Sequence, residues 1–301
     1  MNYLKKGMLS LAVISALGFS GCGNTNPTND DVSKGVFIDS SVSGIAYKTV
    51  TKAGLTDDNG TFKYKEGEEV TFSIGGIKLG ATRGEAILTP QELAGVTEVN
   101  NSRAEDILVL LQTLDKDHNA SNGIDITETI RGTAESMNIN FLEDSINMDA
   151  IINQFGIDAS YKVSNSEAIA HFQETLKLKY PDIGLKFTSD MILNKSFYKI
   201  FVKEDKTTVI YVKVTFNENN VRFIFGTKDD YLNGTTGTDT GSYSINQNGT
   251  LKNGNDIWKL LKIEEDKIVI LNTINTDDNG NTIAERQGIE KWLSKKPVGF
   301  P

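Results

Sequence analysis

Apolar residues recur at every third or fourth position between Ala104 and Leu114, which is the spacing of one face of an α-helix. Val109 and Leu110 widen this face, so the sequence predicts a deeply buried helix. Ser102 and Glu105 have the spacing of a capping box, in which each side chain satisfies a backbone N–H of the other residue. We therefore expect Ser102 to cap the start of this helix.

The helix runs into a loop that is crowded with Asp and Asn. Four residues with side-chain oxygens occupy alternate positions there: Asp115, Asp117, Asn119 and Ser121. Alternating oxygen ligands are typical of a loop that wraps Ca²⁺, although Ala120 and Ile126 stand where an EF-hand has Gly and Glu. Asp125 or Glu128 would have to supply the missing ligand. The sequence leaves two alternatives open, a structural calcium site and a polar turn that ends at Asn122-Gly123.

Short β-strands joined by tight turns are predicted before this helix. The expected strands are 36–38, 44–49, 60–64, 69–74 and 77–79. Phe62 and Tyr64 alternate with lysines, as expected where one face of a sheet is buried. The run Asp57-Asp58-Asn59-Gly60 predicts a β-hairpin, because Asn-Gly accepts the positive φ angles of tight turns. Residues 81–100 are expected to form a connector through Thr89-Pro90.

The segment from Val42 to Tyr64, with its turn DDNG followed by TFKY, resembles the carboxypeptidase-regulatory-like β modules of bacterial envelope proteins. In that family such modules are structural or adhesive and rarely catalytic. The resemblance therefore implies a β-sandwich module without chemistry of its own.

Three helices are expected after the Asp-rich loop. Thr127 can cap a short helix, and Asn147 can cap another that ends near Phe155. Ser164 and Glu167 form a capping box for a third helix, which stops before Pro181. Residues 101–180 are thus predicted to be mostly helical and to pack on the β module.

From Ser196 onward apolar and polar residues alternate, which predicts antiparallel strands of a barrel or a sandwich. The expected strands are 196–203, 207–216, 220–226, 241–246, 257–263 and 267–274, with 282–287 as a further candidate. Aromatic residues are expected in the core of this region: Phe197, Tyr198, Tyr211, Phe216, Phe223, Phe225 and Trp258. The strand order, with GSYSI, WKLLKI and KIVIL, resembles the small lipocalin-like domains of bacterial lipoproteins. Because no lipocalin entrance motif is present, the resemblance implies an architecture and not a bound ligand.

The chain begins like a secretory signal, with Lys5 and Lys6 before the apolar run Met8 to Phe19. This run is too short for a permanent membrane span. Phe19-Ser20-Gly21-Cys22 resembles the lipobox of bacterial lipoproteins, although that family usually has an aliphatic residue in place of Phe19. The resemblance implies that residues 1–21 are removed and Cys22 is lipidated. A plain signal peptide with an incidental cysteine is the alternative.

Gly23 follows Cys22 where an Asp often retains lipoproteins at the inner membrane, so the outer membrane is the expected location. Removal of residues 1–21 removes two lysines, which leaves 29 Lys and Arg against 40 Asp and Glu, a net charge of −11. This balance argues against nucleic acid as a partner, because nucleic-acid binding needs a basic face. The lone cysteine also excludes an internal disulfide framework.

No catalytic residue is predicted. The sequence has no Gly-x-Ser-x-Gly elbow, no phosphate-binding glycine loop and no His-Glu-x-x-His helix. Of the two histidines, His118 is expected to be a solvated loop residue and His171 to lie at the edge of a helical stripe.

The sequence thus predicts an α+β protein with four parts: a signal peptide (1–21), a flexible tether (22–34), a β module with helices (35–185) and an antiparallel β-barrel or sandwich (186–301). The expected role is binding or structural, with the membrane reached through the lipid and an unknown small ligand or envelope protein as partner. The alternative is an envelope hydrolase acting on glycans or esters. A Ser–His contact in a cleft would favour that alternative.

Replacement of Cys22 by Ser tests the lipid anchor. We expect Cys22→Ser to release the protein from membranes or to leave it unprocessed, because serine has no thiol to carry the lipid. Membrane fractionation and the electrophoretic mobility of the protein report the change. A variant that fractionates and migrates like the wild type would show that Cys22 is not an anchor.

Overall fold

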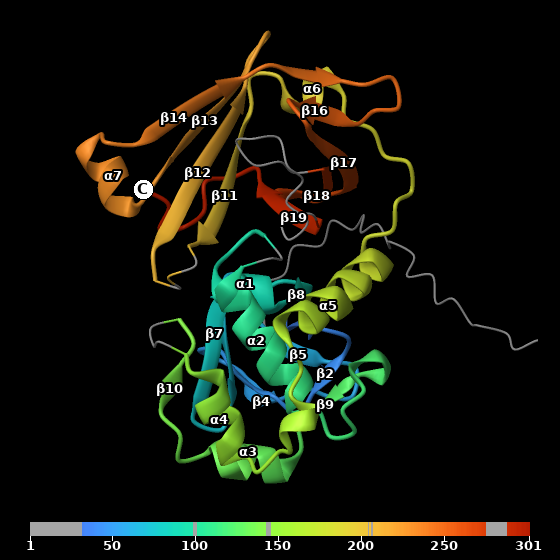
Figure 1. Cartoon of the computed structure of the whole chain (residues 1–301), viewed down its shortest axis with the longest axis vertical. Helices are drawn as coiled ribbons and strands as arrows, with labels where there is room; N and C mark the ends of the chain where they lie inside the picture. The colour runs from blue at the N-terminus through green and yellow to red at the C-terminus, as the bar shows by residue number, and fades with distance from the viewer. Residues whose placement is uncertain (1–31, 99–100, 143–145, 204, 206, 275–287) are drawn as a thin grey trace, which may run out of the picture. The chain divides into compact units, whose positions relative to one another are not determined.

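The structure is a computed structural model that describes residues 32–98, 101–142, 146–203, 205, 207–274 and 288–301. In these described residues, ten short strands and six α-helices precede the C-terminal strands (Figure 1). The first eight strands are β1 (Ser33–Phe37), β2 (Val42–Ser43), β3 (Ala46–Lys48), β4 (Ala53–Leu55), β5 (Thr61–Tyr64), β6 (Glu69–Ile74), β7 (Ile77–Arg83) and β8 (Ile87–Leu88). Strands β9 (Ile124–Asp125) and β10 (Ile139–Asn140) follow among the helices.

These strands form three small sheets. Their orders are β5-β1-β8, β10-β7-β6-β3-β4 and β2-β9. Phe62 and Tyr64 are buried while Lys63 is exposed, so the predicted alternation in β5 is confirmed. The ring of Phe72 in β6 lies 5.0 Å from the ring of Phe37 and 5.2 Å from that of Phe62, and these contacts join two of the sheets.

The turn predicted at residues 57–60 is present, but the predicted hairpin is wrong. The Asp57 carboxylate accepts the N–H groups of Asn59 and Thr61, and Gly60 has a φ of 73°. However, β4 pairs with β3, and β5 pairs with β1. The turn therefore joins two sheets. The exposed strand β4 belongs to the sheet of β3, whereas β5, whose rings are buried, belongs to the sheet of β1.

Helix α2 (Ser102–Thr113) is buried along most of its length, as predicted, but Ser102 does not cap it. The cap is Asn101, whose Oδ1 accepts the N–H of Arg103 and whose Nδ2 donates to the carbonyl of Val202. Glu105 accepts a hydrogen bond from Asn165 and does not complete a capping box. The contact with Val202 is a tertiary one, and the local pattern contains no sign of it.

The other predicted helix starts are confirmed. Thr127 caps α3 (Glu128–Ala134), Asn147 caps α4 (Met148–Gln154), and Ser164 with Glu167 forms the capping box of α5 (Asn165–Lys179). Residues 81–100 are more than a connector, because they contain part of β7, all of β8 and helix α1 (Pro90–Ala94), which starts with a Thr89–Glu92 capping box. Two short 3₁₀ turns, η1 (Ala120–Asn122) and η2 (Ala159–Tyr161), complete this half.

The C-terminal strands form one antiparallel sheet that curls into a nearly closed barrel, so the α+β class is confirmed. The sheet order is β14-β13-β12-β11-β19-β18-β17-β16-β15. The strands are β11 (Ser196–Val202), β12 (Val209–Phe216), β13 (Val221–Gly226), β14 (Gly237–Gly241), β15 (Tyr243–Ile245), β16 (Leu251–Asn253), β17 (Asp256–Ile263), β18 (Lys267–Ile274) and β19 (Gly288–Leu293). Helix α6 (Ser189–Ile192) precedes β11, and α7 (Lys228–Asn233) lies between β13 and β14. The edge strands β14 and β15 are consecutive in the chain, so residue 242 alone separates the two edges. The candidate strand at 282–287 lies outside the described residues.

The barrel core contains the predicted rings of Phe197, Phe216 and Trp258, together with Trp292. The Trp292 ring lies 5.0 Å from that of Trp258 and 5.8 Å from that of Phe197. Phe225 is 41% exposed, so its predicted place in the core is wrong. Its ring instead covers Gly237 of the neighbouring strand, where the missing side chain leaves room.

Buried ion pairs connect the two halves of the compact unit Val32–Pro301. Lys291 pairs with Glu92, and Lys267 pairs with Glu85. The side chain of Lys291 is only 3% exposed. Burial alone raises the pKa of Glu92, but the ammonium groups of Lys291 and Lys267 outweigh this effect and hold the pKa below its ordinary value.

A third lysine extends this set. Lys199 of β11 lies 2.7 Å from a carboxylate oxygen of Glu98 and 2.9 Å from one of Glu290. The apolar part of the same junction is built from Leu108 and Val109 of α2, Phe172 and Leu176 of α5, and Leu261, Val269 and Ile289 of the barrel.

Replacement of Glu92 by Gln tests the importance of this junction. We expect Glu92→Gln to lower the free energy of unfolding by about 3–5 kcal/mol at pH 7, because Lys291 is left buried without its carboxylate. The native pKa of Glu92 is depressed, so its contribution is present above its unfolded pKa and is lost as the pH falls through the native pKa. The difference between the variant and the wild type in urea unfolding should therefore shrink in acid.

The matched control is Glu265→Gln, which removes the exposed partner of Lys295. This exposed pair should contribute much less than the buried pair, because solvent screens the attraction between its charges. Equal losses in the two variants would contradict a special role for the buried junction.

Candidate functional site

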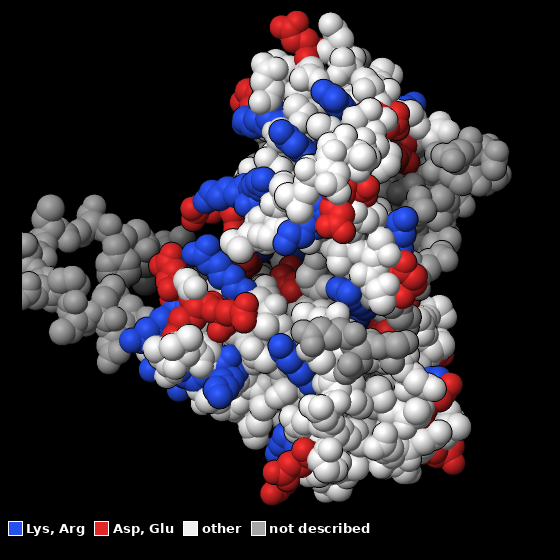
Figure 2. Space-filling model, turned by 90° about the vertical axis from the view of Figure 1, so that its left-hand side faces the viewer, with Lys and Arg blue, Asp and Glu red and all other residues white. Residues whose placement is uncertain are grey.

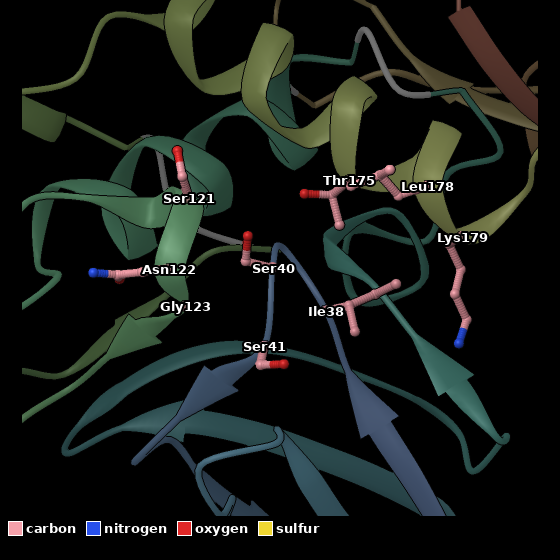
Figure 3. Close-up of a pocket in the computed structure, with 9 residues that line it drawn as sticks. All are labelled: Ile38, Ser40, Ser41, Ser121, Asn122, Gly123, Thr175, Leu178 and Lys179. Atoms are coloured by element: carbon pink, nitrogen blue, oxygen red, sulfur yellow. The ribbon is translucent and has the colours of Figure 1, made fainter. Parts of the chain in front are cut away.

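Two adjoining hollows form a polar groove on the N-terminal half. The first, of about 380 Å³, is lined by Ile38, Ser40, Ser41, Ser121, Asn122, Gly123, Thr175, Leu178 and Lys179 (Figure 3). The second, of about 350 Å³, is lined by Ser41, Ser43, Asp58, Asp115, Lys116, Asp117, Asn122, Gly123, Ile124 and Asp125. They share Ser41, Asn122 and Gly123, so we treat them as one groove.

Four segments far apart in the sequence build the groove, and one of them is the turn between β4 and β5, which contributes Asp58. The turn between β1 and β2 contributes Ser40 and Ser41, and the loop after α2 contributes the residues from 115 to 125. The last turns of α5 contribute Thr175 and Lys179 (Figure 3). The groove is therefore a product of tertiary packing.

The Asp-rich loop satisfies its own carboxylates. Asp115 is 2% exposed, and its two oxygens accept the backbone N–H groups of Asn119 and Asp125, each at 2.9 Å. Asp117 accepts a hydrogen bond from Asn122 Nδ2 at 2.9 Å. Backbone and amide N–H groups thus supply the positive partners that the end of the helix lacks.

The two carboxyl groups of this loop titrate differently. Burial, together with the nearby Asp117, raises the pKa of Asp115. The hydrogen bond from Asn122 is the main reason why the pKa of Asp117 is lowered. Asp117 is therefore the member of the pair that ionises at the lower pH.

The four predicted calcium ligands do not all meet. Asp115 and Asp117 line the second hollow together with Asp125, whereas Ser121 lines the first hollow and Asn119 lines neither. Across the described ranges, no three His, Cys, Asp or Glu side chains are grouped to hold a metal ion. Calcium binding at this loop stays a prediction.

The structure brings together one pair that sequence reasoning missed. Ser40 Oγ lies 3.1 Å from His171 Nε2, although the two residues are 131 positions apart. His171 belongs to α5, and Ser40 lies at the tip of the β1–β2 turn. No local motif surrounds either residue, so the sequence contained no signal for the pair. His118, by contrast, stacks on Tyr161 with 4.1 Å between the ring centres.

A buried carboxyl group lies beneath this pair. Asp39 is fully buried, and Gln112 Nε2 donates to its two oxygens at 3.2 and 3.0 Å. Burial raises the pKa of Asp39 to about 8, even though the Gln112 hydrogen bond acts in the opposite direction. Burial likewise lowers the pKa of His171, so the imidazole is neutral at neutral pH.

The arrangement differs from a Ser-His-Asp triad. In a triad, the acid and the serine contact opposite nitrogens of the imidazole. Here Asp39 Oδ1 lies 3.9 Å from His171 Nε2, the same nitrogen that faces Ser40. The site is a Ser–His pair above a buried carboxyl group.

Comparison with known proteins adds no further identification: no family model, no curated protein and no solved structure matches this chain. Within the part of the chain that the structure covers, none of the helices has the length and apolar character needed to cross a membrane. On the face shown in Figure 2, basic and acidic side chains are interspersed. The fold and the groove define the class: an α+β protein with a nearly closed antiparallel barrel and a polar groove on its N-terminal half.

Thermal melting with and without calcium tests the loop. We expect millimolar Ca²⁺ to raise the melting temperature and EDTA to lower it, because a ligand that binds only the native state stabilises it by mass action. Asp117→Ala should remove the difference while keeping the fold. The matched control is Asp229→Ala, which changes a carboxylate of α7 and should keep the calcium response. Identical melting curves of the wild type in Ca²⁺ and EDTA would show that the loop is only a polar turn.

Proposed function

We propose that this chain is a lipid-anchored protein of the bacterial cell envelope that binds a polar ligand in the groove. The proposal of an anchor rests on the resemblance of residues 1–22 to a lipoprotein signal, with Cys22 as the lipidated residue and the outer membrane as the location. The N-terminal β module and the C-terminal barrel are then binding or structural parts, as their resemblance to carboxypeptidase-regulatory-like and lipocalin-like domains implies.

The single observation that carries the binding role is the composition of the groove. One end has the four carboxylates of Asp58, Asp115, Asp117 and Asp125 with a single lysine, Lys116. The other end has hydroxyl groups and Lys179. A ligand that fits both ends has a cationic group at one end, an anionic group at the other and hydrogen-bonding groups between them.

The interior of the barrel is a poorer candidate for the ligand. The rings of Phe197, Phe216, Trp258 and Trp292 contact one another in its core. Rings packed in this way contact other protein side chains and do not present their faces to a ligand. The groove is therefore where we place binding.

In the cell envelope, peptides that carry both amino and carboxylate groups are attached to the glycan of the wall, and this chemistry matches the groove. Such a ligand would be held by charge at both ends and by hydroxyl groups in the middle. We therefore propose a peptide-bearing glycan as the ligand class.

Co-sedimentation with insoluble cell-wall polymer tests this function. We expect the chain from Gly23 onward to sediment with the polymer, and Lys179→Glu to weaken binding about tenfold or more, because a like charge then faces the anionic group. The matched control is Lys177→Glu on the same helix, since Lys177 pairs with Glu174 and does not line the groove. No sedimentation of the wild type, or equal binding by both variants, would contradict the proposal.

A further inference from the structure

Ser40 has an unfavourable backbone conformation at the tip of the β1–β2 turn. Its φ is 63°, in the left-handed region where glycine is the usual residue. Ile38 and Ser41 form the bridge that closes this two-residue turn. A serine held in such a conformation indicates a role for its side chain, because glycine would form the same turn without strain.

The Ser40 hydroxyl group lines the first hollow of the groove. In Figure 3 it points into the space between Ser121 and Thr175, whereas the side chain of Ser41 points away from it. An approaching carbonyl group can therefore reach Ser40 Oγ from the hollow. The Thr175 hydroxyl group on the far side is a donor for the oxygen of that carbonyl group.

His171 is placed to accept the proton of Ser40. Its Nε2 lies 3.1 Å from Ser40 Oγ, and α5 holds the ring one turn before Thr175. The side chain is 18% exposed, and its lowered pKa keeps the imidazole neutral at neutral pH, which is the form that acts as a base.

Asp39 is a positioning residue for the charge that would form on His171. Its Oδ1 lies 3.9 Å from His171 Nε2, and Gln112 fixes the carboxyl group from the other side. A proton transferred to His171 would create a positive charge beside this carboxyl group. The negative end of the carboxyl dipole at Oδ1 then faces this charge and stabilises the imidazolium without a further proton transfer.

We propose that Ser40 and His171 form a catalytic pair for acyl transfer from small esters that enter the first hollow. Ser40 Oγ forms a bond to the ester carbonyl carbon, and its proton passes to His171 Nε2. The bond to the alcohol oxygen breaks, and the alcohol leaves with that proton. Water then attacks the acyl-serine through His171, which releases a carboxylic acid and restores the Ser40 hydroxyl group.

This activity goes beyond the proposed binding role, although it uses one end of the same groove. A small uncharged ester needs neither Lys179 nor the carboxylates of the second hollow. The two proposals also have separate readouts on the wild type: co-sedimentation with the cell-wall polymer reports binding, and acetylation of Ser40 reports the reaction. The failure of one proposal is thus distinguishable from the failure of the other.

Acylation by p-nitrophenyl acetate tests the proposal. We expect the mature protein to release p-nitrophenol and to carry one acetyl group on Ser40, identified by mass spectrometry of peptides after acid quenching. His171→Gln should slow the release at least about 100-fold, because the general base is lost. Ser166→Ala, which removes an exposed hydroxyl group at the start of α5, should react like the wild type.

Ser40→Gly separates catalysis from folding. Glycine suits the positive φ, so this variant should melt at the same or a higher temperature than the wild type and should carry no acetyl group at the turn. Acetylation confined to other residues, or equal release of p-nitrophenol by Ser40→Gly and the wild type, would overturn the proposal.

Discussion

The architecture depends on burying lysine ammonium groups of the barrel against carboxylates of the N-terminal half. Lys267 and Lys291 lie on neighbouring strands of the barrel, and both are nearly inaccessible to solvent. Removing a charge from water is unfavourable unless an opposite charge compensates it, and Glu85 and Glu92 provide that compensation. The two halves are therefore matched by charge as well as by the apolar contacts of α2 and α5.

This junction also determines the position of α5. The helix packs Phe172 and Leu176 against α2 and the barrel, so its adjacent flank, with His171 and Thr175, lies beside the β1–β2 turn. The packing of α5 against α2 and the barrel therefore positions the Ser–His pair and one wall of the groove. Gln112 of α2 reinforces the arrangement, because it donates both to Asp39 and to the carbonyl of Ala168 in α5.

The Asp-rich loop both compensates the end of α2 and gives the second hollow its carboxylates. Carboxylates at the end of a helix call for positive partners, and the sequence suggested a bound cation. In the structure, Asp115 receives two backbone N–H groups, so the end of α2 is compensated within the loop. The carboxylates that still face the second hollow give that end of the groove its negative character.

The sequence alone determined the elements whose signals are local. The alternation of residues located six of the nine barrel strands, and the Thr127, Asn147 and Ser164 caps located three helix starts, because side-chain period and capping depend on residues a few positions apart. Tertiary structure decided the rest. Asn101 replaced Ser102 as the cap because it also binds Val202. Ser40 contacts His171, 131 positions away, and Glu92 contacts Lys291, 199 positions away. Only the packing of whole helices and strands brings such distant side chains together.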